Sequence, residues 1–220
     1  MNQRNQIHGL VLALALIPAA ASAADARAIS GRVVDPDGKG VPQAVVFVEA
    51  PLPPAARASA ESKAEMNQIN RTFVPGVLPV VVGTLVNFPN SDQIHHHVYS
   101  FSRTKTFELP LYRGENAKPV LFDKPGVVKI GCNIHDWMSG IILVLPSAWY
   151  AVTDAQGRYA LPGLPAGEYT LVAWHEQSRG KTADTEKRVR VADGDATANF
   201  DLALTAATKR PDRHGARTDP

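Results

Sequence analysis

The sequence predicts an all-β fold made of two units. Glycine and proline are frequent, with 16 and 17 of the 220 residues, and no stretch keeps the apolar periodicity of a helix. Short runs rich in valine and aromatic residues alternate instead with turn-forming residues. The style of strands and turns in the first fifty residues returns after Pro146, and the strands between these two parts differ from it. We therefore expect two β-sandwiches.

The N-terminal 23 residues have the features of an export signal. Arg4 supplies a positive charge, residues 10–17 are apolar, and residues 21–23 read Ala-Ser-Ala, a small-residue cleavage site. The apolar run is too short to span a bilayer, and no later run is long enough. We therefore expect cleavage near Ala23, a periplasmic mature protein and no transmembrane segment.

The first strands after the signal form a hairpin. Residues 29–34 and 44–48 read as strands, and residues 35–40, which follow the first, carry Pro and Asp-Gly, which suit a turn. Two strands are too few to fold alone. Residues 51–65 are proline-rich at their start and predict an exposed connector rather than a central strand.

The central segment predicts a sandwich of its own. A turn is expected at residues 123–126, and Gly83 separates two apolar runs. About seven short strands within a hundred residues are typical of an antiparallel sandwich. The expected strands are residues 67–74, 77–82, 84–88, 96–101, 120–122, 127–132 and 141–144.

The pattern of the first hairpin returns after Pro146. The expected strands are residues 150–153, 158–161, 169–174, 187–191 and 198–204. Together with the first hairpin they make a small sandwich, so we expect residues 24–50 plus 148–205 to form a split outer unit into which residues 66–147 are inserted. Residues 206–220 are polar, carry several basic residues and lack an apolar pattern, which predicts a disordered tail.

Charge and cysteine content narrow the functional classes. Without Arg4 of the signal, 22 basic residues face 21 acidic ones, and a net charge near +1 argues against a nucleic-acid partner. Cys132 is the only cysteine, so it forms no internal disulfide. Because an unprotected thiol in an exported protein is liable to oxidation, metal ligation is a more attractive explanation than an inert buried thiol.

A metal-ligand pattern surrounds this thiol. Cys132, His135 and Met138 are spaced at i, i+3 and i+6, so a loop with about three residues per turn can direct all three at one point. One further imidazole from the histidine triplet at residues 95–97 would complete a set of metal donors with two nitrogens, one thiolate and one thioether. This donor set fits a mononuclear blue-copper site better than zinc, whose closed sites lack thioether ligands.

Strand alternation ranks the three histidines. The thiol of Cys132 shares the apolar face of its strand, and His96 shares the apolar face of the earlier strand. His95 and His97 would then point outward, unless a bulge interrupts the strand. Either of them could still contribute to the site.

The central segment resembles the cupredoxins. The similarity lies in the C-x-x-H-x-x-M loop, the histidine segment, residues 87–92 and residues 123–126, and it covers roughly residues 66–145. More narrowly, the chain is similar to exported methylamine-utilisation-type proteins that combine a cupredoxin with a carboxypeptidase-regulatory-like (transthyretin-like) module. Residues 31–35, 153–159 and 167–169 match that second module.

This resemblance implies a cupredoxin Greek-key sandwich inserted into a small transthyretin-like or Ig-like β-sandwich. It implies one mononuclear type 1 copper, with His96, Cys132 and His135 as equatorial ligands and Met138 as the axial ligand. The implied function is one-electron transfer between a redox-protein donor and acceptor, without enzyme activity. Two departures concern the site: His95 replaces the family's proline, and His97 replaces an asparagine that ties the ligand loops together.

Several alternatives remain open. The protein could bind and deliver copper, or be a protein- or glycan-binding module with a secondary copper site. A Cys-His nucleophile would need an oxyanion hole and an orienting residue that the sequence does not supply, and a binuclear copper centre would need a second cysteine. Trp137 could either form a docking surface or only shield the site. His175 is expected to be a structural strand-end residue, and the acidic turn residues lack calcium-loop spacing.

Overall fold

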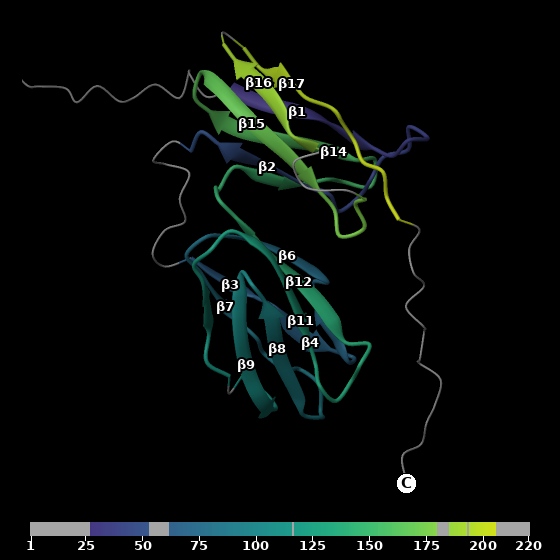
Figure 1. Cartoon of the computed structure of the whole chain (residues 1–220), viewed down its shortest axis with the longest axis vertical. Coiled ribbons are helices and arrows are strands. Elements are labelled where there is room, and N and C mark those ends of the chain that lie inside the picture. Colours follow the sequence, from purple (N-terminus) through teal and green to yellow (C-terminus); the bar gives the residue numbers. More distant parts are fainter. Residues whose placement is uncertain (1–26, 53–61, 116, 180–184, 193, 206–220) are drawn as a thin grey trace, which may run out of the picture.

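The computed structural model describes residues 27–52, 62–115, 117–179, 185–192 and 194–205, arranged as two stacked β units (Figure 1). The predicted signal, residues 1–23, and the predicted tail, residues 206–220, lie outside the described residues. All the regular elements of the described residues are strands, so the all-β prediction is confirmed.

The outer unit consists of two sheets built from both ends of the chain. One sheet has the order β14-β1-β17, with β18 also paired to β1, and the other has the order β13-β2-β15-β16. The strands are β1 (Arg27–Val34), β2 (Val45–Ala50), β13 (Tyr150–Val152), β14 (Arg158–Leu164), β15 (Gly167–Trp174), β16 (Lys187–Val191), β17 (Ala196–Thr197) and β18 (Phe200–Asp201). The first two strands therefore pair across the whole central segment with strands that follow residue 149.

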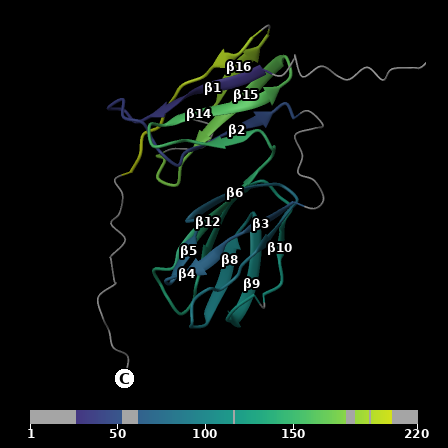
Figure 2. The same cartoon turned by 180° about the vertical axis from the view of Figure 1, so that it is seen from behind.

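The central unit consists of a five-stranded sheet, β6-β12-β11-β8-β9, a three-stranded sheet, β10-β7-β3, and the hairpin β4-β5. Figure 2 shows β3 and β10 from behind. The strands are β3 (Lys63–Glu65), β4 (Asn67–Ile69), β5 (Thr72–Val74), β6 (Val77–Val81), β7 (Thr84–Asn87), β8 (His96–Ser102), β9 (Lys105–Tyr112), β10 (Val120–Phe122), β11 (Gly126–Gly131) and β12 (Ser139–Leu145).

Four details of the central unit differ from the sequence prediction. The strand β9 was not expected. The pairs β12/β6 and β3/β7 are parallel, so the unit is a mixed sandwich and not an antiparallel one. Residues 63–65, expected within the connector, form the short edge strand β3. The single strand expected over residues 67–74 is a hairpin, because Asn70 and Arg71 adopt positive φ angles of 53° and 57° and reverse the chain between β4 and β5.

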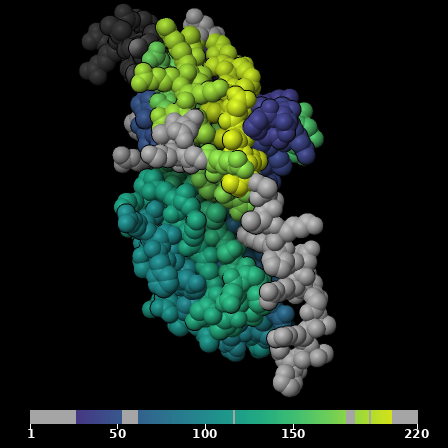
Figure 3. All heavy atoms as spheres, turned by 45° about the vertical axis from the view of Figure 1, so that its right-hand side comes forward, coloured from purple at the N-terminus to yellow at the C-terminus, as the bar shows by residue number. Residues whose placement is uncertain are grey.

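The two units are joined by a third apolar cluster. Each unit has its own core between its sheets, and this third cluster combines Val45, Phe47 and Val172 of the outer unit with Leu143 and Leu145 of β12. All residues of β2 except the last two are buried, since one face packs inside the outer unit and the other packs on β12. The space-filling view shows the units in direct contact (Figure 3).

Among the residues that the structure describes, no helix has the length and apolar character needed to cross a bilayer.

Candidate metal centre

Three chain segments meet at the end of the central unit that faces away from the outer unit. His96 is the first residue of β8, Cys132 directly follows β11, and His135 and Met138 lie in the loop before β12. This loop is closed by its own backbone, since the Cys132 N–H donates to the Met138 carbonyl (3.1 Å) and the Met138 N–H donates to the His135 carbonyl (2.9 Å). The loop is thereby held at the end of the β11–β12 pair.

The donor atoms of His96, Cys132 and His135 converge. The Nδ1 atoms of His96 and His135 are 3.2 Å apart, and the Cys132 Sγ lies 4.0 Å from the first and 3.7 Å from the second. In a triangle with sides of 3.2, 3.7 and 4.0 Å, the point equidistant from the corners lies about 2.1 Å from each, close to metal–nitrogen and metal–sulfur bond lengths of about 2.0–2.3 Å. The three atoms therefore surround a space of the size of a metal ion.

These donors differ in their access to water. His96 is fully buried, Cys132 and Met138 are nearly so, and His135 is half-buried. Burial, followed by the charges of His96 and Arg71, lowers the pKa of His135 below its ordinary value. This shift favours the neutral ring, which is the form that binds a metal. Among the described residues, His96, Cys132 and His135 form the only group of three or more His, Cys, Asp or Glu residues whose ligand atoms converge in this way.

The histidine triplet follows the predicted alternation in orientation but not in burial. His95 is exposed and His96 is buried, as predicted, whereas His97 is also buried, with 5% of its surface exposed. The His97 ring lies against Tyr99, and the Tyr99 ring lies against the exposed Phe101, so His97 is on the outward face of β8, as expected. Its Nε2 lies 2.7 Å from the Glu108 carboxylate, and its buried Nδ1 has no hydrogen-bond partner among the described residues. The register of β8 with β9 shifts between His96 and Val98.

Asp92 is a residue of this centre that the sequence reasoning missed. Its Oδ2 lies 2.7 Å from His96 Nε2. Burial alone would raise the pKa of Asp92, but hydrogen bonds from the Arg71 N–H, the His96 ring and the Asn70 N–H together lower it below its ordinary value. The spacing of four residues from His96 was the only signal in the sequence, and nothing in it distinguishes Asp92 from any acidic loop residue.

Buried polar side chains support the loop that carries Asp92. Asn90 donates through Nδ2 to the carbonyls of Ile94 and Tyr112, both at 2.9 Å. Tyr112 in turn donates to the Phe88 carbonyl and accepts a hydrogen bond from Gln68 Nε2. Burial, in the first place, raises the pKa of Tyr112 to about 12, so its hydroxyl stays protonated and keeps this role.

Exposed apolar side chains lie in the segments that carry or contact the donors. Ile134 and Trp137 of the ligand loop are 49% and 42% exposed, and the Trp137 ring lies against His135 with a centroid distance of 5.4 Å. Ile94 and Ile69, which neighbour the histidine triplet and the β4–β5 turn, are also exposed. The half-buried His135 is therefore the candidate ligand that lies beside exposed apolar side chains.

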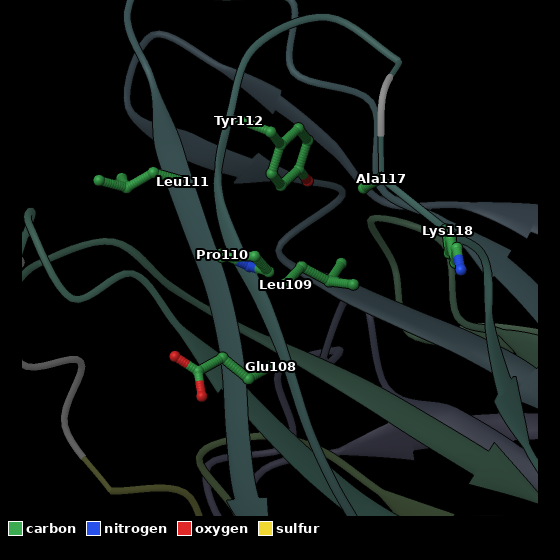
Figure 4. Close-up of a pocket in the computed structure, with 7 residues that line it drawn as sticks. All are labelled: Glu108, Leu109, Pro110, Leu111, Tyr112, Ala117 and Lys118. Carbon is green, nitrogen blue, oxygen red and sulfur yellow. The ribbon is translucent and has the colours of Figure 1, made fainter.

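A pocket of about 400 Å³ lies elsewhere, along β9 and the segment that follows it. Residues 108–112 line it with Ala117 and Lys118, and the side chains of Leu109 and Tyr112 point toward Ala117 while Leu111 and Glu108 point to the other side of the strand (Figure 4). None of His96, Cys132, His135 and Met138 lines this pocket.

The remaining residues singled out from the sequence have structural roles. His175 follows β15, and its Nδ1 accepts a hydrogen bond from the Gln177 N–H. Asp35 accepts from the N–H groups of Asp37 and Lys39, and Asp154 accepts from those of Gln156 and Arg158. These are the contacts of turn-stabilising side chains.

Known proteins resemble both units. The family model of the carboxypeptidase regulatory-like domain matches residues 141–205, which include the outer strands from β13 onward. No curated protein sequence matches the chain.

Solved structures resemble part of the chain. A copper-containing nitrite reductase from Thermus scotoductus SA-01 is 27% identical over 43% of this chain, which spans only 27% of that protein, with a TM-score of 0.36. A purple cupredoxin from Nitrosopumilus maritimus is 24% identical over 38% of this chain and 99% of its own (TM-score 0.33). A point mutant of amicyanin in its reduced state is 22% identical over 46% and 98% (TM-score 0.35). These TM-scores are all below 0.5, so the matches are partial.

Proposed function

We propose that this protein binds one copper ion at His96, Cys132 and His135, with Met138 as the axial ligand, and serves as an exported one-electron carrier between two redox proteins. The observation that carries the proposal is the convergence of two imidazole nitrogens and one thiol sulfur around a point about 2.1 Å from each. Two nitrogens and a thiolate, with a weak thioether, are the donors of a blue-copper centre.

Burial and backbone bonding support electron transfer over catalysis. Copper bound to such donors exchanges one electron between its Cu(I) and Cu(II) states. The closed 132–138 loop and the buried His96 hold the donors in one arrangement, so the protein has little to rearrange when the charge changes. The half-buried His135, whose Nδ1 is 3.7 Å from the thiol and whose ring lies next to the exposed Trp137, would lead the electron from the buried sulfur to the protein surface.

The apolar side chains around His135 fit a transient protein partner. Ile134 and Trp137 are large, exposed and adjacent to the ligand, which is typical of the centre of a protein–protein contact. We propose that a redox partner docks here, and that export delivers the protein to the periplasm where such partners work.

The proposal is tested by loading the purified protein with Cu(II) and recording its visible spectrum. A trigonal His₂Cys centre should give an intense thiolate-to-copper band near ~600 nm. The loaded protein should then pass through repeated cycles of ascorbate reduction and ferricyanide oxidation without losing copper. A colourless Cu(II) protein would contradict the blue-copper assignment, and a protein that gives up its copper to a Cu(I) chelator on reduction would be a delivery protein instead.

A further inference from the structure

Two neighbouring histidines each contact a carboxylate at the same distance. His96 Nε2 lies 2.7 Å from Asp92 Oδ2, and His97 Nε2 lies 2.7 Å from Glu108 Oε1. The pairs differ in burial, since the Asp92 side chain is 13% exposed and that of Glu108 is 70% exposed. They differ also at the other ring nitrogen, because His96 Nδ1 faces the donors of Cys132 and His135 while His97 Nδ1 is unpartnered.

Asp92 makes more contacts than Glu108. Its Oδ1 accepts the Asn70 N–H at 2.6 Å, and its Oδ2 accepts the Arg71 N–H at 2.8 Å in addition to the contact with His96. Its own N–H donates to Asn90 Oδ1 at 3.0 Å. One carboxylate thus joins the turn of the β4–β5 hairpin, the loop before β8 and the first histidine of the centre.

These contacts orient the His96 ring. An ionised carboxylate can only accept hydrogen bonds, so the nitrogen that faces Asp92 is the donor of this contact. Nε2 is therefore held by Asp92, and Nδ1 is directed toward Cys132 and His135. A carboxylate on the far side of a ligand imidazole also makes the ligating nitrogen a stronger donor.

We infer that Asp92 is a positioning residue of the metal centre, which holds His96 with Nδ1 directed at Cys132 and His135 and fastens the β4–β5 turn to that ligand. This inference rests on the proposed copper site. A stronger nitrogen donor and a nearby negative charge both favour Cu(II) over Cu(I). Asp92 therefore lowers the reduction potential of the centre, whereas Glu108, whose histidine is outside the donor triangle, leaves it nearly unchanged.

The experiment compares Asp92→Asn with the matched variant Glu108→Gln, each as the full copper-loaded protein. Potentiometric titration of the visible band should show that Asp92→Asn weakens Cu(II) relative to Cu(I) binding by about tenfold, which corresponds to a rise of about 59 mV for one electron. Glu108→Gln should stay close to the unmodified protein. An unchanged potential in Asp92→Asn, or equal shifts in both variants, would overturn the inference.

A second measurement needs no metal. Amide hydrogen exchange of Asn70 and Arg71 should be slow in the unmodified protein, although both lie in an exposed two-residue turn, because the Asp92 carboxylate holds their N–H groups. In Asp92→Asn the amide that faces the new NH₂ group loses its acceptor and should exchange at least about tenfold faster, and in Glu108→Gln neither amide should change. Fast exchange in the unmodified protein would contradict the inference that Asp92 holds the β4–β5 turn.

The outcomes separate this inference from the proposed function. If the unmodified protein gives no blue band with copper, the proposed function fails, and the role of Asp92 as a ligand-positioning residue fails with it. If the band is present but the Asp92→Asn potential equals that of the unmodified protein, only the inference about Asp92 fails.

Discussion

The two units use their polar side chains differently. In the outer unit and its junction, the buried hydroxyls of Thr153 and Ser147 donate to the backbone carbonyls of Val41 and Val48, at 2.7 and 2.9 Å. In the central unit, buried imidazoles and a thiol face one another, and both buried side-chain atoms without a partner among the described residues, Gln68 Oε1 and His97 Nδ1, are found there. The outer unit is built for stability, whereas the central unit carries polar groups that packing alone does not explain.

Exposed apolar side chains show the same contrast. Of the ten large exposed ones among the described residues, eight lie in the central unit: Ile69, Val74, Ile94, Phe101, Leu111, Leu121, Ile134 and Trp137. Large exposed apolar residues that gather at one place mark contact surfaces. The proposed docking surface, Ile134 and Trp137 beside His135, is part of this unit.

The loop that carries His135 and the junction between the two units lie at opposite ends of β12. This strand begins at Ser139, beside the ligand loop, and ends at Leu145 in the cluster shared with the outer unit. Seven strand residues span roughly 20 Å. Changes at the junction should therefore affect stability, and changes at the loop should affect the metal.

The largest expected effect is that of Cys132→Ser, which tests whether the polar groups of the central unit bind copper. Serine cannot supply the thiolate, so the band near ~600 nm should vanish in the copper-loaded protein. The matched control is His95→Ala, which removes an exposed imidazole outside the donor triangle and should leave the band nearly unchanged. Visible spectra of both variants check this, and a blue Cys132→Ser protein would refute the assignment.

The next largest effect concerns the stability contributed by the junction between the two units. Leu145→Ala should lower the free energy of unfolding by about 3 kcal/mol, because it opens a cavity in the fully buried junction cluster. Urea unfolding measures the loss. The visible band of the loaded variant should persist, and its disappearance would show that the two units are not independent in the way described.

A smaller loss is expected for Thr153→Val, which keeps the shape of the side chain. The Thr153 hydroxyl donates to the Val41 carbonyl and accepts the Ala44 N–H, so the change leaves two buried backbone groups unpaired and should cost about 2 kcal/mol. The control is Thr197→Val at an exposed strand position, with little expected effect. Equal stability of the two variants in urea would contradict the role given to Thr153.

The smallest effect concerns the pH dependence of the outer unit. Burial lowers the pKa of His175, against the opposing charge of Glu176, so the unfolded chain takes up a proton near pH 6.5 while the folded one does so only at lower pH. Stability should therefore fall as pH drops below about 6.5. His175→Asn keeps an acceptor for the Gln177 N–H without titrating, so the difference from the unmodified protein should shrink or reverse between about pH 7.5 and 5.5 in thermal unfolding. A constant difference would exclude this contribution.

Sequence reasoning was strongest where a pattern repeats. Period-2 alternation correctly placed Val128, Ile130 and Cys132 on one buried face, and the turn chemistry of Asp35 and Asp154 was read correctly. The C-x-x-H-x-x-M spacing led to a loop whose cysteine and histidine do meet a second histidine.

Sequence reasoning failed where one residue interrupts a pattern. The burial of His97 accompanies its contacts with Tyr99 and with Glu108 of β9. The strand β9, in which Pro110 breaks the alternation of exposed and buried residues, was not predicted at all. The β4–β5 turn depends on Asn70 and Arg71, since no glycine marks it. The contact of Asp92 with His96 combines a loop, a hairpin and a strand, which no local pattern encodes.

X-ray absorption spectroscopy at the copper edge of the loaded protein tests the central claim most directly, because it counts the ligand atoms themselves. The account predicts one short copper–sulfur distance and two copper–nitrogen distances from imidazoles, and the loss of the sulfur contribution in Cys132→Ser. A copper environment of nitrogen and oxygen alone in the unmodified protein would contradict it.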